Sequence, residues 1–290
     1  MAFTPPTLAS ETIAHIGSFP IRNSMVMGWL AMLVLITVAL VIKKRGLKMV
    51  PRGLQNFVEM IVEGMFDFFD TVVQDKKQTM KFFPIVATIF IFVITSNWMG
   101  ILPGVGSIGF YEKEHEIAAV ENNIGIASTE ENTETTGAAE AGNAEVPKEV
   151  FIPYFRSAYA DVNMTFALAI ISVVLTQIYG LMALGFFHYS GKFFKNPLKD
   201  PIGSAVGILE LISEVSKMIS FSFRLFGNIF AGEILLTVIG FLAPYIAPIP
   251  FYGLEIFVGF VQALVFSLLT LVFMKMAVTP HHEQAEPLYL

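Results

Sequence analysis

The sequence predicts an all-α membrane protein with about five membrane helices, an interfacial amphipathic helix, and a long, strongly tilted helical hairpin at its end. Of the 290 residues, 54% are hydrophobic and only 14% are charged, whereas an average soluble domain carries roughly 25% charged residues. Apolar runs long enough to cross a bilayer alternate with clusters of Lys and Arg. The absence of Cys excludes disulfides and thiol-based metal or catalytic sites. The net charge of −6 argues against a nucleic-acid partner.

The first span follows an N-terminal segment, residues 1–24, that we expect to lie outside the cell. Residues 25–42 are eighteen residues without a charge, enough to cross a hydrocarbon core of about 30 Å. Lys43, Lys44 and Arg45 follow directly. Because Lys and Arg mark the cytoplasmic side, this cluster places the N-terminus outside.

Residues 25–104 are expected to hold two spans, with an amphipathic helix at 50–74 between them. Acids in that helix recur at spacings of four, four and three, which places them on one helical face; they are Glu59, Glu63, Asp67 and Asp70. Such a helix is typical of the membrane surface. The second span then covers 82–103.

A loop and a third span follow. Residues 105–156 form an acidic external loop, in which 112–149 contain ten Glu and two Lys, a composition typical of a solvated segment. Residues 157–200 hold the third span, 161–188, and a basic cytoplasmic turn.

The hairpin occupies 201–279 and precedes a cytoplasmic tail, 280–290. Its first helix, 202–243, would be about 60 Å long, twice the hydrocarbon thickness, so we expect a steep tilt. Gly227 and Gly232 would permit a kink. The second helix runs over 252–278, after three prolines.

A polar stripe lies on the first hairpin helix. At about 100° per residue, six polar side chains fall within about 40° of one line, over about 27 Å of helix. The stripe consists of Glu210, Ser213, Lys217, Ser220, Arg224 and Asn228.

Among these residues, Arg224 has the highest free-energy cost of insertion, since placing an arginine inside a membrane costs between ~3 and ~17 kcal/mol. The positions three or four residues away hold no acid, so its counter-charge must lie on another segment or another protein. It could pin two helices of this chain through Glu233, Glu255 or Asp161. Alternatively it faces a mobile carboxylate and, because a guanidinium keeps its proton, acts as a fixed positive barrier.

Two further acids in the hairpin suggest a proton relay. Glu233 follows Arg224 by nine residues and therefore faces the opposite side of the helix. On the last helix, Glu255, Gly259 and Gln262 share one face, so Glu255 and Gln262 could meet Glu233 across the hairpin. Buried carboxyl groups that repel one another are suited to proton exchange near neutral pH. Acids in an aqueous vestibule without a transport role are the alternative.

Several motifs resemble subunit a of the rotary F-type ATP synthase. The most specific is the run 223–233, Phe-Arg-Leu-Phe-Gly-Asn-Ile-Phe-Ala-Gly-Glu. The preceding segment 209–217 is also similar to that family. So are the run 161–165, which contains Asp161 and Asn163, and the end of the second span around Asn97 and Leu102-Pro103. The likeness covers most of residues 25–278 and fades in the acidic loop.

The resemblance implies a role for each polar residue. Arg224 would be the essential stator arginine facing the ion-binding carboxylates of a rotating c-ring. The outer half-channel would involve Asn97, Asn228, Glu233, Glu255 and Gln262. The inner half-channel would involve Glu210 and Ser213, with Lys217 and Ser220 as further candidates, as are Asp161 and Asn163.

The resemblance also implies partners and a location. The partners would be the c-ring subunits, the subunit b peripheral stalk, the remainder of the ATP synthase and membrane lipid. The location would be a bacterial inner membrane, or alternatively an organelle inner or thylakoid membrane, with the C-terminus cytoplasmic. No cofactor or metal is expected, and no nucleotide-binding motif is present, so catalysis of its own is not predicted.

The identity of the relay group and two alternatives for the function stay open at this stage. Some family members carry His where Glu255 stands, which leaves the relay group and its pH dependence undecided. A sodium-coupled version of the same subunit is one alternative. An independent ion channel or secondary transporter is another, although the inverted repeats typical of transporters are not seen.

Overall fold

The computed structural model describes residues 10–17, 19–45, 53–102, 104–113, 149–186, 189, 191, 201–243 and 245–279. Five helices in these ranges are long and apolar enough to cross a membrane. The chain is therefore a multi-pass, predominantly helical membrane protein, as the sequence predicts. The central part of the acidic loop, the basic turn 192–200 and the tail 280–290 lie outside the described residues.

The helices begin and end close to the predicted positions. The first spans are α1 (Asn23–Arg45) and α3 (Lys76–Gly100), with the amphipathic helix α2 (Leu54–Val73) between them. The third span is α5 (Val162–Leu184), and the hairpin consists of α7 (Pro201–Leu242) and α8 (Pro248–Val278). Helix α7 is continuous over 42 residues, so neither of its central glycines breaks it.

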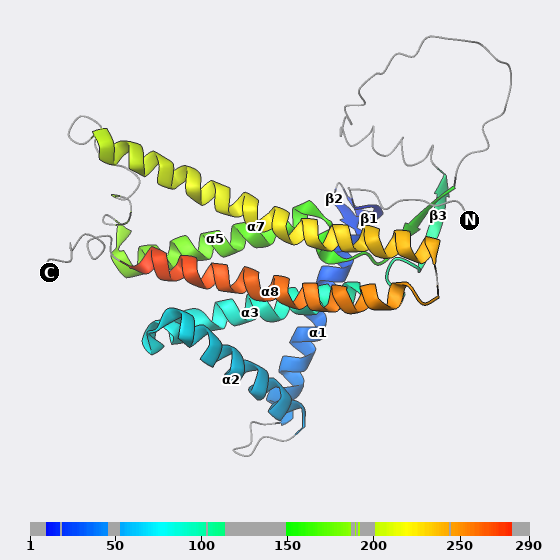
Figure 1. Ribbon diagram of the computed structural model, residues 1–290, viewed down its shortest axis with the longest axis horizontal. Coiled ribbons are helices and arrows are strands. Elements are labelled where there is room, and N and C mark those ends of the chain that lie inside the picture. Colours follow the sequence, from blue (N-terminus) through cyan, green and yellow to red (C-terminus); the bar gives the residue numbers. More distant parts are fainter. Residues whose placement is uncertain are drawn as a thin grey trace, which may run out of the picture.

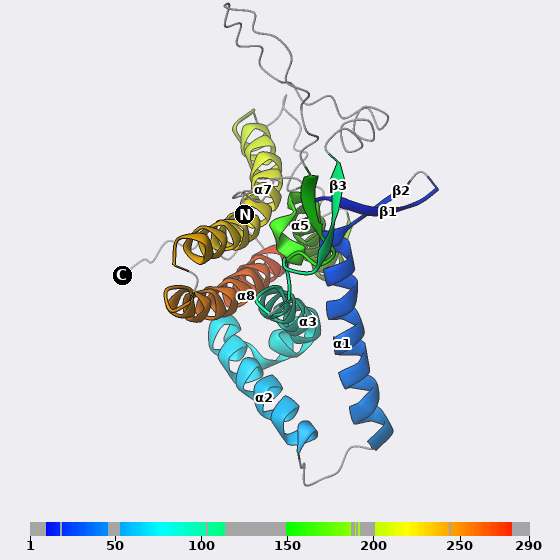
Figure 2. The same ribbon diagram turned by 90° about the vertical axis from the view of Figure 1, so that its right-hand side faces the viewer.

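Four helices run side by side and a fifth crosses them. Helices α3, α5, α7 and α8 extend along the long axis of the molecule, whereas α1 runs across that direction in both views (Figures 1 and 2). The first part of α7 rises away from α5 and α8 (Figure 1). Because α1 has the length of one membrane crossing, this crossing arrangement fits a steeply tilted α7–α8 hairpin.

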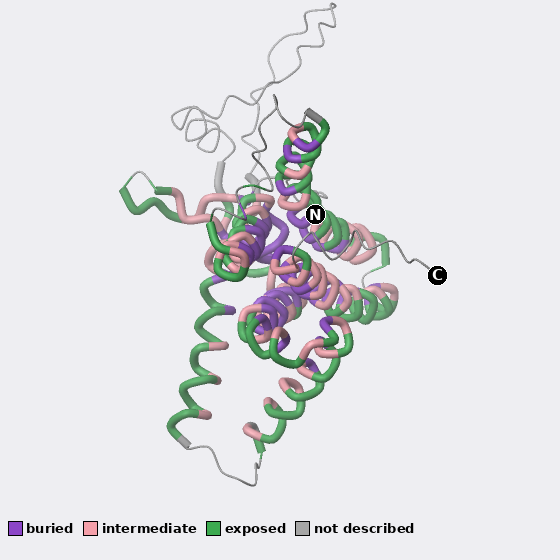
Figure 3. The backbone as a smooth tube through the Cα atoms, turned by 90° about the vertical axis from the view of Figure 1, so that its left-hand side faces the viewer, coloured by how far each residue is buried: buried purple, intermediate pink, exposed green. Residues whose placement is uncertain are grey.

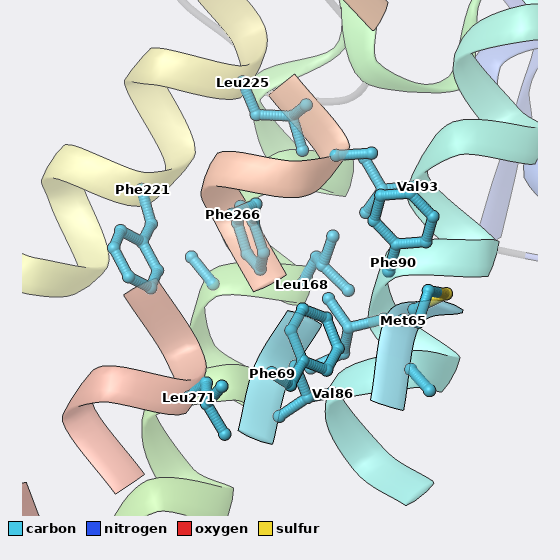
Figure 4. Close-up of a cluster of buried hydrophobic side chains, with 14 of the residues drawn as sticks. Met65, Phe69, Val86, Phe90, Val93, Leu168, Phe221, Leu225, Phe266 and Leu271 are labelled. Carbon is cyan, nitrogen blue, oxygen red and sulfur yellow. The ribbon is translucent and has the colours of Figure 1, made fainter. Parts of the chain in front are cut away.

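The hydrophobic core lies where α2, α3, α5, α7 and α8 meet. Large side chains from all five helices interlock there (Figure 4). Phe69 and Leu225 are fully buried, and Phe221 stacks on Phe273 with ring centroids 5.6 Å apart. Helix α1 is largely exposed along its length (Figure 3). An apolar helix with so little protein contact requires lipid around it.

Two short β-hairpins, absent from the sequence prediction, lie at one end of the helices. Strands β1 (Thr12–Ile16) and β2 (Phe19–Arg22) pair in the N-terminal segment. Strands β3 (Gly109–Lys113) and β4 (Glu149–Pro153) pair at the two ends of the acidic loop. The alternating patterns are only four or five residues long, too short to stand out in the sequence. The α7–α8 turn lies at the same end (Figure 1), which we call the hairpin end.

Candidate ion-path site

A cavity of about 400 Å³, lined by charged, polar and apolar side chains, opens between the helices at the hairpin end. Helices α3, α7 and α8 supply its walls, together with the loops on either side of the β3–β4 hairpin and the N-terminal segment. Its charged lining groups are Glu11, Arg156, Glu233 and Glu255. The cavity thus joins two acids that the sequence analysis selected, Glu233 and Glu255, with two charged residues that it missed. We call it the hairpin-end cavity.

Arg156 forms a buried ion pair with Glu233. Its Nε lies 3.0 Å from Oε1 and 3.3 Å from Oε2 of that carboxylate. The Arg156 side chain is only 3% exposed, whereas the Glu233 side chain is 26% exposed. The guanidinium carbon also lies 6.0 Å from the Phe230 ring centroid, within the range of a cation–π contact. An arginine so deeply buried needs a counter-charge, and Glu233 supplies it.

Glu255 approaches the backbone of α7 at Gly232. A Cβ at this glycine would lie 2.5 Å from Glu255 Oε2 and closer still to Oε1 and Cδ. The missing side chain therefore makes room for the carboxylate. Gly232, which the sequence analysis treated as a point of kinking, instead allows Glu255 to sit against the helix. Among the described residues Glu255 forms no salt bridge, although it is 7% exposed.

Three amide side chains link α3 and α7 to α8. Asn97 Nδ2 donates to the Gly259 carbonyl at 3.0 Å, linking α3 to α8. Asn228 Nδ2 donates to Gln262 Oε1 at 2.7 Å, linking α7 to α8. Gln262 thus meets Asn228 rather than Glu233, whose partner is Arg156. Amide side chains both accept and donate hydrogen bonds, so these groups extend a series of polar contacts into the hairpin.

Arg224 points away from the hairpin-end cavity. It is exposed, as are Ser213, Ser220 and Asn228 on the same stripe, and Glu210 is half-buried. Apolar neighbours such as Ile219 and Phe223 are also exposed on this face. The part of the chain that the structure describes gives Arg224 no acidic partner, because the three acids proposed for it lie elsewhere.

A second charged group lies nearer the start of α7. Lys217 Nζ contacts Glu214 Oε1, three residues earlier on the same helix, at 2.6 Å, and lies 4.5 Å from the Phe273 ring centroid. Tyr189 lies close by: burial, together with the negative charges of Glu214 and Glu210, raises its pKa to about 12. Glu214 was not selected from the sequence because it lies off the stripe.

Asp161 anchors the N-terminal segment. Its carboxylate accepts hydrogen bonds from Ser10 and, at 2.9 Å, from Ser24, and Arg22 Nη1 lies 3.8 Å away. It also caps α5 by accepting the Asn163 backbone N–H at 2.9 Å. Neither Asp161 nor the exposed Asn163 lines the hairpin-end cavity. Asp161 thus ties the N-terminal segment to the start of α5.

Within the described ranges, no three His, Asp or Glu side chains lie close enough together to hold a metal ion. The carboxyl groups of the cavity are of the kind that exchange protons, and the amides can hold hydrogen bonds beside them. The fold and these groups define a class: a multi-pass helical membrane protein with a polar path between its helices.

The family follows from comparison with known proteins. The chain belongs to the family described as "ATP synthase A chain", whose model matches residues 25–275. A protein named ATP synthase subunit a from Gloeobacter violaceus is 32% identical over 264 residues, covering 90% of this chain and 85% of its own. The protein of that name from Syntrophobacter fumaroxidans is 29% identical over 277 residues, covering 94% and 91%. The one from Campylobacter jejuni subsp. doylei is 32% identical over 230 residues, covering 79% of each.

Proposed function

We propose that this chain is the proton-translocating stator subunit of an F-type ATP synthase. It would form two offset aqueous half-channels against a rotating ring of c subunits, with Arg224 as the barrier between them. The single observation that carries the proposal is the opposite placement of two groups on α7. Arg224 lies on the exposed apolar face, whereas Glu233 lies in the hairpin-end cavity on the other side.

The hairpin-end cavity is the outer half-channel in this proposal. Lysines at the start of α3, like the basic cluster at the end of α1, favour a cytoplasmic location for those helix ends, so the cavity at the other end of α3 would face outward. A proton would enter among Glu233, Glu255 and Asn97, and the Asn228–Gln262 pair would lead it toward the exposed face of α7. There it would neutralise a carboxylate of the ring.

The inner half-channel would lie along the first part of α7. Glu210 and Ser213 are the leading residues, with Ser220 and the Glu214–Lys217 pair beside them. A proton released from the ring would reach the cytoplasm along this exposed polar strip. Each charge that crosses gains ~2.3 kcal/mol per 100 mV, and rotation of the ring would carry that energy to nucleotide sites on other subunits.

Arg224 prevents a short circuit between the two paths. Its guanidinium keeps its charge at every physiological pH, so it repels a free proton and attracts one ionised ring carboxylate at a time. Loss of the charge should stop coupled turnover and leave a leak. Subunit b of the peripheral stalk would hold the chain stationary while the ring moves.

Proton pumping by the whole ATP synthase in membrane vesicles tests the proposal. ATP-driven acidification should disappear in Arg224→Ala, whereas ATP hydrolysis by the detached catalytic sector persists. Ser216→Ala, an exposed position on the same helix outside the stripe, is the matched control and should pump normally. Acidification by Arg224→Ala at the rate of this control would overturn the proposal.

A further inference from the structure

The N-terminal segment contributes a carboxylate to the hairpin-end cavity. Glu11 lines that cavity, although it precedes β1 and lies far from α7 in the sequence. Its backbone carbonyl accepts the Asn23 N–H at 3.1 Å, and its Oε2 lies 3.4 Å from Asn23 Nδ2. The adjacent Ser10 hydroxyl donates to Asp161. Contacts on both sides of Glu11 thus fix where its carboxylate lies.

Glu11 shares its electrostatic environment with the buried ion pair. The positive charge of Arg156 and the negative charge of Glu233 both act on its carboxyl group. Burial raises the pKa of Glu11, Arg156 lowers it, and Glu233 raises it again. The charged and titratable groups that line the cavity with it are Arg156 before α5, Glu233 on α7, and Glu255 and Tyr252 on α8. Asp161 accepts the hydrogen bond from Ser10 but does not line the cavity.

The charge balance of this cluster decides how readily it takes up a proton. Arg156 and Glu233 alone are neutral, so a proton added to Glu233 would leave one positive charge buried, which is costly. With Glu11 ionised, the three groups carry one negative charge. Adding one proton then makes the cluster neutral. Whichever of the two acids is protonated, the other carboxylate remains ionised within the electrostatic influence of the guanidinium.

We infer that Glu11 is a proton-exchanging residue of the outer half-channel, which shares Arg156 with Glu233 and allows the cluster to hold one exchangeable proton. Hydronium in the cavity gives its proton to a carboxylate oxygen of this cluster and leaves as water. The proton moves on through cavity water when the ring carboxylate accepts it, and the cluster returns to its negative charge. This role rests on the proposed function, because it presumes that protons enter through this cavity.

ATP synthesis by the whole complex in proteoliposomes tests the role of Glu11. The outer face is oriented inward, and the lumenal pH is varied at constant total proton-motive force. Glu11→Gln should shift the midpoint of the pH profile toward acid by about one pH unit, since a neutral side chain no longer favours proton uptake. Glu11→Asp keeps the charge and should retain a midpoint near that of the wild type. Glu59→Gln, the same change on α2, is the matched control.

The pH midpoint separates proton exchange from a purely structural role. Rates are normalised to the amount of assembled complex, so that poor assembly of Glu11→Gln lowers the yield without moving the midpoint. An unshifted midpoint in Glu11→Gln, or a fall in rate that is equal at every pH, would overturn the inference. Arg224→Ala is measured in the same vesicles. If it is inactive while Glu11→Gln is unshifted, the role of Glu11 fails alone; if it synthesises ATP normally, the proposed function fails.

Discussion

Replacing Gly232 by alanine should displace Glu255 from its position against α7. The added Cβ would lie 2.5 Å from Glu255 Oε2, whereas ordinary contacts begin at 3.4 Å. Oε1 would lie closer still, so the carboxylate must retreat by about 1.5 Å, because the backbone of a packed helix yields less than a side chain. We expect overpacking to cost about 1–3 kcal/mol of stability. The rate of proton transfer should fall by a larger factor than the loss of stability alone would cause, since a misplacement of about 1 Å can slow such a step 100-fold.

The same complex provides the assay and a rescue. ATP-driven proton pumping is compared in Gly232→Ala and in Gly240→Ala, a glycine of the same helix with nothing within 4 Å of its Cβ position. Adding Glu255→Asp to Gly232→Ala withdraws the carboxylate by about 1.5 Å, one carbon–carbon bond, and should restore part of the activity. Equal pumping by the two alanine variants, or no gain from the shorter acid, would refute the steric reasoning.

Further predictions concern the polar groups around the cavity. Arg156→Gln leaves Glu233 buried without its counter-charge, so the complex should lose roughly 3 kcal/mol of stability, measured by thermal unfolding; an unchanged midpoint contradicts this. Asn228→Ala and Gln262→Ala should show a coupling energy of about 1 kcal/mol in a double-mutant cycle, and strict additivity would exclude their contact. Because burial raises the pKa of Glu11 above 4.5, the folded state holds that proton more tightly. The free energy of unfolding should therefore fall as pH rises from 4.5 through the raised pKa, and Glu11→Gln should flatten that slope.

The spans and the face of Arg224 could be predicted because both depend on patterns within one segment. Hydropathy locates a helix, and 100° per residue assigns its faces. The prediction that Arg224 has no partner on its own helix is consistent with its exposed position. The roles assigned to the half-channel residues stay predictions.

The partners of the acids could not be predicted in the same way. Arg156 lies in a loop after β4, and Glu11 precedes β1. Neither belongs to a helical pattern, so nothing in the sequence relates either residue to Glu233. Arg156 could have been selected from its position, because it lies five residues before Asp161 in a segment that leads from the acidic loop into a span. A charge placed there must be either solvated or paired.

The nine residues from Arg224 to Glu233 impose a constraint on length as well as on composition. One residue more or fewer would turn the two groups by about 100° relative to each other. The guanidinium would leave the open face, or the carboxylate would leave the cavity and Arg156. A substitution between these positions leaves the angle between the two groups unchanged, whereas a single-residue insertion or deletion would disconnect the two sides of the helix. Helix α7 is in this sense a spacer whose residue count is itself functional.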